Sequence, residues 1–223
     1  MFQVRAKYFI KRTTILDTMK GDFIVIEGID GSGTTTQTKL LCEWLDKKGK
    51  EYVRTQEPVK EELHIGKVIK EHLVQDDDDH SPESIALAFA ADRLIHLEDR
   101  IIPALKEGKT VVSDRYYHSS MVYQPEHGAD LSWVKEINKH ARKPDATIIV
   151  DVPAEESMKR QQKRDGGESS VIFENLDFQK NIRERYIKLE EGLEEDIYIV
   201  DGVRSKQEVH EDVVEIVREV MEK

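Results

Sequence analysis

Five short apolar runs recur along the chain, each rich in Val and Ile and nearly continuous rather than alternating with polar residues. Runs of this kind are typical of strands that are buried on both faces of a parallel sheet. We therefore predict strands at Phe23–Glu27, Tyr52–Thr55, Thr110–Ser113, Thr147–Val152 and Ile197–Val200.

Helical patterns separate these runs. Leu41 and Leu45 belong to an apolar stripe with helical spacing that ends at Gly49, and Ser81 is an N-cap candidate before Pro82. We predict helices at Thr35–Lys48, Leu63–Leu73, Ser81 to about Lys106 with an interruption before Pro103, Leu131–His140, Ala154–Lys163, Phe178–Glu191 and Lys206–Met221. The alternation predicts an α/β fold with a five-stranded parallel sheet and helices on both faces.

The composition indicates one domain with a heavily charged surface. The 223 residues are 38% hydrophobic and 35% charged, with a formal net charge of -11. This balance argues against broad nucleic-acid binding, and no apolar run approaches the roughly 18 residues of a membrane span. Cys42 is the only cysteine, which favours a reducing, cytoplasmic location. We interpret Cys42 as buried filler rather than a reactive thiol, and Asp76–Asp79 as a solvated loop rather than a metal site.

The first residues differ from the rest. Residues 1–18 are basic with a single acidic residue, and they lack the apolar region and cleavage site of a secretory signal. A transit peptide is a weaker alternative, because the segment has no serine. We interpret 1–18 as an N-terminal extension ahead of a functional domain at 19–223.

The segment FIVIEGIDGSGTTTQ, Phe23–Gln37, passes from a predicted strand through a glycine-rich turn into a predicted helix. This is the layout of the phosphate-binding P-loop G-x-x-x-x-G-K-[ST], except that Thr34 stands where lysine is expected. Thr35 occupies the position whose hydroxyl binds Mg2+. The alternative is a tight turn with no ligand. The candidate ATP-binding residues are Gly28, Ile29, Asp30, Gly31, Ser32, Gly33, Thr34, Thr35 and Thr36.

Further motifs follow in order along the chain: TQEP, LAFAADR, VVSDRYYHSS, YQ, KPDATIIVDV and FENLDFQKNIRERY. Together with the glycine-rich turn they resemble thymidylate kinases, the P-loop enzymes that phosphorylate dTMP. The resemblance extends from about Lys20 to the C-terminus. It implies a P-loop NTPase-type fold, an ATP site on the loop with Mg2+, a dTMP site opposite, a mobile lid and a homodimer.

A second group of candidates surrounds the predicted end of the third strand. Asp114 ends the apolar run TVVSD, where a carboxylate can organise Mg2+ together with Thr35; the alternative is an ordinary helix cap. The resemblance implies that Arg115 binds the substrate phosphate and that Asp30 lies near the reacting groups. Whether Asp30 acts as a base or orients groups stays open.

Candidates for the acceptor site begin with Phe89 and Arg93, which share one helix face at i, i+4. From the residues alone, Phe89 would be core and Arg93 a surface ion-pair partner. The resemblance implies instead that Phe89 stacks on thymine and Arg93 donates to its carbonyl. It also implies that Tyr123 bounds the sugar and Gln124 reads the base edge. Glu57 and Ser119 complete the substrate candidates, although Ser119 fits helix capping equally well.

The segment MKRQQKRDGGESSVIFE resembles the family's lid, at about 160–175. Glycine, serine and charges with few apolar residues suit a segment that orders on ligand binding. Arg160, Lys163 and Arg164 are the catalytic cations that we expect from it. The alternative is a solvated helix face.

The chain departs from the family pattern at Thr34, at Gln56 and Ile172 where arginines are usual, and at His118 where aspartate is common. Removing one preorganised donor typically costs about 10²–10³ in rate. Because the metal and base-pocket candidates remain, we interpret the chain as a modified enzyme. A related nucleotide kinase with shifted acceptor specificity and a nucleotide-binding protein that has lost transfer are the alternatives.

Overall fold

The computed structural model describes residues 20–59, 65, 69, 80–164 and 172–222. The predicted extension at 1–18, most of the predicted helix Leu63–Leu73, Asp76–Asp79 and the lid residues 165–171 lie outside this described part.

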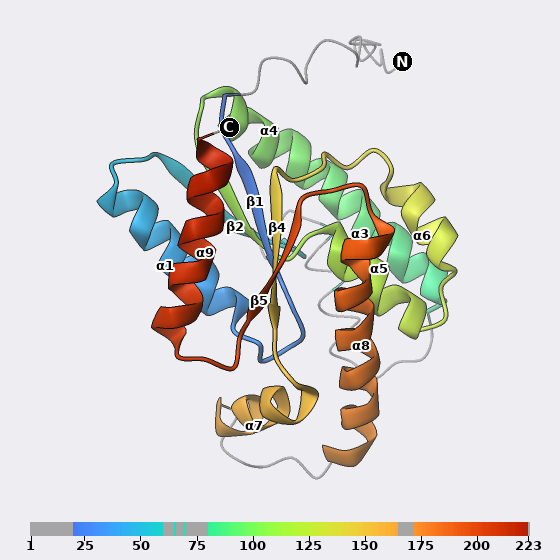
Figure 1. Cartoon of the computed structure of the whole chain (residues 1–223). Helices are drawn as coiled ribbons and strands as arrows, with labels where there is room; N and C mark the ends of the chain where they lie inside the picture. The colour runs from blue at the N-terminus through green and yellow to red at the C-terminus, as the bar shows by residue number, and fades with distance from the viewer. Residues whose placement is uncertain (1–19, 60–64, 66–68, 70–79, 165–171, 223) are drawn as a thin grey trace, which may run out of the picture.

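Five parallel strands form a single sheet. They are β1 (Phe23–Glu27), β2 (Tyr52–Gln56), β3 (Thr110–Asp114), β4 (Ala146–Asp151) and β5 (Ile197–Asp201). The order across the sheet is β2-β3-β1-β4-β5, so β1 is the central strand (Figure 1). The predicted strands and the parallel sheet are confirmed.

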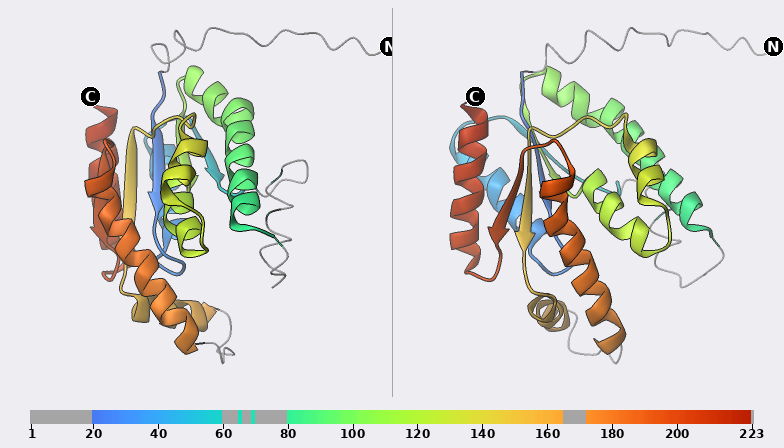
Figure 2. Two further views of the ribbon diagram at one scale, coloured as in Figure 1. Left: turned by 90° about the vertical axis from the view of Figure 1, so that its right-hand side faces the viewer. Right: turned by 45° about the vertical axis from the view of Figure 1, so that its right-hand side comes forward.

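Helices cover both faces of this sheet, as predicted (Figure 2). Those described are α1 (Thr34–Lys47), α3 (Pro82–His96), η2 (Leu97–Ile101), α4 (Ile102–Lys106), α5 (Tyr117–Glu126), α6 (Leu131–Asn138), α7 (Ala154–Arg164), α8 (Ile172–Gly192) and α9 (Lys206–Met221). Two expectations were incomplete. Helix α5 was not predicted, and α8 begins at Ile172 instead of Phe178.

The predicted interruption before Pro103 is a widened π turn, η2, that joins α3 to α4. Proline has no N–H to donate to the preceding turn, and its ring crowds the carbonyl of residue 99. A π turn is one way in which a helix accommodates such a position without ending. The chain from Pro82 to Lys106 is therefore helical throughout.

Two hydrophobic cores lie on opposite faces of the sheet. Phe23 and Val25 of β1 face one core, which includes residues of α5 and α8. Ile24 and Ile26 face the other, where α1 and α9 pack. Because successive side chains of a strand point to opposite faces, both sets must be apolar, which explains the continuous runs in the sequence.

The register brings the carboxyl ends of three neighbouring strands together. Asp114, the last residue of β3, is paired with Ile26 of β1 and with Gln56 of β2. The loops that follow these strands therefore meet at one edge of the sheet. In open α/β sheets, ligands bind at this edge.

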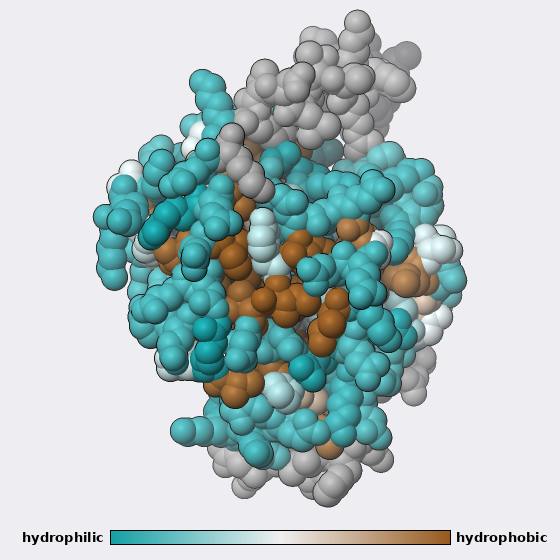
Figure 3. All heavy atoms as spheres, viewed as in Figure 1, coloured by the Kyte–Doolittle hydropathy of each residue, from teal (hydrophilic) through white to brown (hydrophobic). Residues whose placement is uncertain are grey.

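The face of the molecule drawn in Figure 3 is mainly hydrophilic, in keeping with the high charge content. Apolar side chains gather over β5, between α8 and α9 (Figure 3), where Ile187, Ile199 and Val203 are exposed. Among the described residues, none of the helices combines the length and the apolar character that crossing a membrane requires.

Candidate active site

The glycine-rich loop between β1 and α1 is held by close backbone packing. Gly28 has φ 152° and Gly31 has φ 86°, values that L side chains rarely adopt. A Cβ on Gly28 would lie 2.8 Å from the Val150 carbonyl oxygen, and one on Gly31 would lie 2.6 Å from that of Ser157. Only glycine fits either position, so the loop is a tightly fixed structure.

Helix α1 begins at Thr34 with Gly33 as its N-cap. Gly33 has no side chain to cap the helix, which leaves amide groups of the first turn available to a ligand. Backbone N–H groups at a helix N-terminus, together with the helix dipole, favour an anion such as phosphate. The geometry at 28–36 is therefore suited to the phosphate binding that the sequence predicts.

Thr35 and Asp114, the two predicted metal residues, lie in direct contact. The Thr35 hydroxyl donates to Asp114 Oδ2 at 2.6 Å. The other oxygen, Asp114 Oδ1, is buried and has no hydrogen-bond partner within the described part of the chain. A hydroxyl and a carboxylate are hard oxygen ligands of the kind that Mg2+ prefers. The residues present thus fit a Mg2+ ion.

Asp30 and Arg115 also meet across the loop. Arg115 Nη2 lies 2.5 Å from Asp30 Oδ1, and the Arg115 guanidinium carbon lies 5.3 Å from the centre of the Tyr123 ring. Arg115 Nη1 donates to Ser119 Oγ at 3.1 Å. The predicted catalytic pair and two of the predicted substrate residues are thus brought into one cluster.

Arg93 and Glu57 form a buried ion pair. Arg93 Nε donates to Glu57 Oε2 at 2.7 Å, and the side chains are only 2% and 4% exposed. Arg93 also donates to Ser120 Oγ at 3.0 Å and to Asn138 Oδ1. The reading of Arg93 as a surface residue is wrong. Its contact with thymine stays a prediction, and in this structure its guanidinium binds protein groups.

His96 completes this buried network. Its Nδ1 lies 3.1 Å from Glu57 Oε1, and its Nε2 lies 2.6 Å from the Thr55 hydroxyl. Neither His96 nor Asn138 was singled out from the sequence. The sequence gives little indication that these two residues are buried, because polar side chains on a helix are more often exposed.

Three further substrate candidates lie on α3 and α5. Phe89 is half-buried on α3, one turn before Arg93. Burial raises the pKa of Tyr123 to about 12, so this hydroxyl keeps its proton at neutral pH. Gln124 is buried, and within the residues that the structure describes its Oε1 has no partner. A buried amide oxygen without a partner is a suitable acceptor for a ligand donor.

The three predicted lid cations lie on α7, but they differ in position. Arg160 Nη2 donates to the Gly202 carbonyl at 3.0 Å, and Arg160 Nη1 lies 3.4 Å from the Ser32 carbonyl. Arg160 therefore reaches the glycine-rich loop. Lys163 and Arg164 are exposed at the end of the helix.

His118, one of the departures from the family pattern, pairs with Glu195 and not with a candidate site residue. It is fully buried, with Nε2 2.9 Å from Glu195 Oε2. Glu195 also accepts the Tyr117 hydroxyl at 2.6 Å. Although burial would raise the pKa of Glu195, the hydrogen bonds from His118 and Tyr117 hold it below its ordinary value. His118 therefore anchors α5 to the segment before β5.

Glu27 and Tyr186 are polar residues of this region that the sequence reasoning missed. Both are buried, and the Tyr186 hydroxyl donates to Glu27 Oε2 at 2.8 Å. Glu27 had one visible signal, a charge at the end of a wholly apolar strand. Tyr186 looks like an ordinary core aromatic of a helix.

Comparison with known proteins places the chain in a family. A model of the thymidylate kinase family matches residues 26–213. The chain is 44% identical over 202 residues to a probable thymidylate kinase of Pyrococcus horikoshii, covering 90% of this chain and 97% of the relative. It is 37% identical over 207 residues to a thymidylate kinase of a Thermoanaerobacter species, covering 91% of this chain and 100% of the relative. The chain belongs to the thymidylate kinase family.

Proposed function

We propose that the protein transfers the γ-phosphoryl group of ATP to dTMP, giving dTDP and ADP for dTTP synthesis. An oxygen of the dTMP phosphate forms the new bond to the γ-phosphorus while the bond to the β-bridging oxygen breaks. Little covalent chemistry is required of the protein, so its residues act by positioning and by stabilising charge.

The proposal rests on one observation: two pairs of interacting residues lie together at one edge of the sheet. Thr35 touches Asp114, and Asp30 touches Arg115. One pair offers oxygen ligands for a cation and the other a guanidinium for an anion, both beside a loop that suits phosphate. A phosphoryl transferase requires this combination.

Mg2+ is the cofactor that we propose, held through Thr35 and Asp114. When bound, it would neutralise charge on the ATP phosphates. The residues 28–36 would bind those phosphates through backbone N–H groups, including that of Thr34.

The dTMP site is proposed to lie between α3 and α5. Arg115 would bind the acceptor phosphate through its planar donor fork, with Asp30 beside it. Phe89 would stack on the base, and Tyr123 would exclude a 2'-hydroxyl from the sugar site. Gln124 would use its unpaired oxygen at the base edge. Arg93 and Glu57 would support this pocket from behind.

Arg160 is our choice for the cation that replaces the missing lysine. Lys163 and Arg164 were equal candidates from the sequence, but Arg160 is the one that contacts the Ser32 carbonyl. A guanidinium beside the loop supplies the positive charge that the missing lysine would otherwise bring to bound phosphates.

A coupled assay of ADP release tests the proposal across dTMP, dUMP, UMP and thymidine, each with Mg2+ and ATP. We expect dTMP to be phosphorylated fastest and thymidine to be inert, because thymidine offers no phosphate to Arg115. Preference for another monophosphate would favour a kinase of shifted specificity. ATP binding without ADP release on any acceptor would identify a binding protein.

We further propose a homodimer in the cytoplasm, as the family resemblance implies. Sedimentation equilibrium of the purified protein measures the mass directly. A mass equal to that of one chain at micromolar concentration would exclude the dimer.

A further inference from the structure

Glu27 is a charged residue at the end of the wholly buried strand β1, and its own side chain is fully buried. Its Oε1 accepts the backbone N–H groups of Tyr116 at 2.8 Å and Ser119 at 3.2 Å. Its Oε2 accepts the hydroxyls of Ser119 at 2.7 Å and Tyr186 at 2.8 Å. Glu27 therefore joins β1 to the turn after β3, to α5 and to α8.

The same two hydroxyls contact Arg115. Arg115 Nη1 lies 3.1 Å from Ser119 Oγ and 3.2 Å from the Tyr186 hydroxyl oxygen. Arginine has only donors, so both oxygens accept from it and must direct their hydrogens elsewhere. The Glu27 carboxylate, which has only acceptors, takes those hydrogens. Burial, and then the charge of Glu27, raises the pKa of Tyr186 well above its ordinary value, so the hydroxyl keeps its proton.

Arg115 itself has an unusual backbone. Its φ of 71° is in the left-handed region, which residues other than glycine seldom adopt. Its N–H donates to the Ile26 carbonyl at 2.9 Å, and its carbonyl accepts the Ser113 hydroxyl at 2.7 Å. The next amide, that of Tyr116, binds Glu27. Strained residues held in this way by their surroundings concentrate at functional sites.

We propose that Glu27 is a positioning residue for phosphoryl transfer, fixing Arg115 against the substrate phosphate through the hydroxyls of Ser119 and Tyr186. This role rests on the proposed dTMP kinase activity and on the proposed contact of Arg115 with the acceptor. Glu27 touches neither nucleotide. It acts by setting the direction of two hydroxyl dipoles.

The substitution Glu27→Gln reverses those dipoles with almost no change in size. The Gln oxygen must face the backbone N–H groups of Tyr116 and Ser119, because these groups only donate. The Gln amide nitrogen then faces both hydroxyls, which must turn to accept from it. Ser119 Oγ and the Tyr186 hydroxyl oxygen lie 2.9 Å apart, so one hydroxyl can donate to the other. The second hydrogen would still point at Arg115 Nη1, where two donors would oppose each other. We expect Arg115 to leave its position.

A double-mutant cycle with Arg115→Ala tests this role. Glu27→Gln should lower kcat with dTMP by about 10- to 100-fold, the usual effect of misplacing a positioning group, and leave the KM for ATP within about threefold. In the Arg115→Ala background, Glu27→Gln should lower kcat by less than about threefold, because the group through which it acts is gone. A purely structural effect would lower kcat equally in both backgrounds.

Two further variants distinguish a loss of positioning from a loss of folded protein. Tyr186→Phe removes only the hydroxyl and keeps the ring in the core, and it should show the same dependence on Arg115. Glu195→Gln is the matched control, because the Glu195 side chain is only 6% exposed and also accepts a tyrosine hydroxyl, from Tyr117 at 2.6 Å. It should lower the melting temperature and leave kcat within about threefold.

Unchanged kcat in both Glu27→Gln and Tyr186→Phe, or full additivity with Arg115→Ala, would overturn the positioning role while leaving the proposed function intact. The parent protein is measured first. A parent that transfers no phosphoryl group to dTMP would instead overturn the proposed function, and the role of Glu27 with it.

Discussion

The buried pair of Arg93 and Glu57 shows how much of this site depends on charges that never reach solvent. Removing one member of a buried ion pair leaves the other unpaired, which typically costs about 3–5 kcal/mol. Arg93 has further bonds to Ser120 and Asn138. The residue therefore stabilises the fold around the acceptor site as well as any contact that it makes with thymine.

Arg93→Met should lower both the free energy of unfolding, by roughly 3–5 kcal/mol, and turnover of dTMP, with ATP binding nearly unchanged. Urea denaturation and steady-state kinetics measure the two effects. In the variant Arg93→Met with Glu57→Gln, stability should recover in part, because no unpaired charge remains. Normal dTMP kinetics in Arg93→Met would remove Arg93 from the pocket.

Asp114→Asn tests the proposed metal site. The amide keeps the shape of the side chain and loses the charge beside Thr35, so the Mg2+ concentration for half-maximal activity should rise by about 10- to 100-fold. A Mg2+ titration of initial rates gives this value. Thr35→Ser, which keeps the hydroxyl, should behave like the parent. An unchanged Mg2+ requirement in Asp114→Asn would exclude Asp114 as a metal residue.

For single residues, the sequence predicted which ones lie at the candidate site better than it predicted their contacts there. The proximity of Asp114 to Thr35 was expected from the place of Asp114 at a strand end beside the loop. The contact of Asp30 with Arg115 was not predicted, because the family resemblance implied only a role for each residue. The orientation of His118 was not readable. Neighbouring helix positions point about 100° apart, so a segment without clear amphipathic spacing does not reveal which of its residues face the site.

At the scale of elements, α7 and the glycine-rich loop are packed together. Gln161 Nε2 and the Ser157 hydroxyl both donate to the Asp30 carbonyl, Gln161 at 2.7 Å. Arg160 reaches the loop from the same helix. The helix that contributes the proposed replacement cation is therefore positioned by the loop that lacks the lysine.

Arg160→Ala should lower kcat by about 10² or more, as for a preorganised donor. Adding Thr34→Lys in that background should restore part of the loss, because the two cations would serve the same phosphates. Kinetics of the single and double variants measure the coupling. Lys159→Ala, an exposed cation on the same helix, is the matched control. If Arg160→Ala is near silent, the missing charge has another source.

Helix α5 escaped prediction for a physical reason. It carries Tyr117, His118, Ser119 and Ser120 at its start and Pro125 within it, a sequence without an apolar stripe or strong helix formers. Tertiary contacts to Glu27, Glu195 and α8 hold it in place. The helices with clear periodicity, such as α1 and α9, were predicted from the sequence to within a residue at each end.

For the whole molecule, we predict that residues 1–18 are dispensable. The described fold begins with Lys20 and Gly21, whose amides donate to the Leu105 carbonyl at 3.2 and 3.1 Å. A protein starting at Met19 should keep its activity and its melting temperature within a few degrees, since about 1 kcal/mol corresponds to roughly 2–4 °C at this size. Insoluble or inactive protein would show that the segment belongs to the fold.

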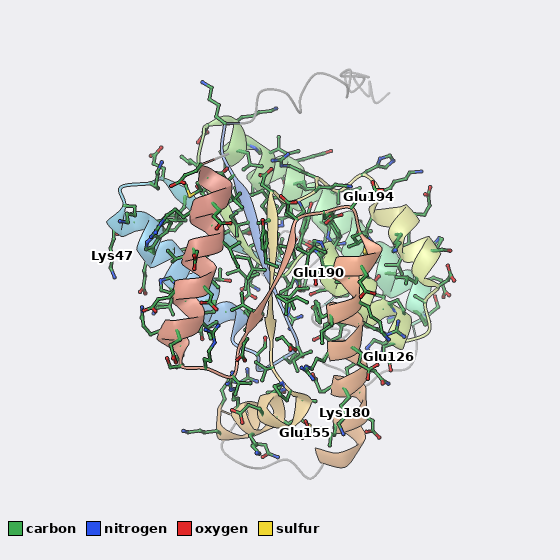
Figure 4. All side chains as sticks on the ribbon, viewed as in Figure 1. Lys47, Glu126, Glu155, Lys180, Glu190 and Glu194 are labelled. Carbon is green, nitrogen blue, oxygen red and sulfur yellow. The ribbon has the colours of Figure 1, made fainter. Side chains whose placement is uncertain are left out.

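Helix α8 is the element that touches both halves of the proposed site. Near its start, Lys180 Nζ lies 3.3 Å from Glu155 Oε1 of α7 (Figure 4). Arg183 donates to both carboxylate oxygens of Asp151 in β4. Further along the helix, the Tyr186 hydroxyl accepts from Arg115. Lys180 and Tyr186 are only about 9 Å apart along the axis. A ligand that displaces α7 would therefore also move α8, and with it the Tyr186 hydroxyl that contacts Arg115.

If ATP and dTMP bind as proposed, a connection through α8 would couple their two binding equilibria. Whatever factor ATP contributes to the affinity for dTMP, dTMP must contribute the same factor to the affinity for ATP. Calorimetric titrations with a non-hydrolysable ATP analogue, in the presence and absence of dTMP, can measure that factor from either side. Lys180→Ala removes the ion pair between α7 and α8 and should bring this factor closer to one, so that each nucleotide would bind independently of the other.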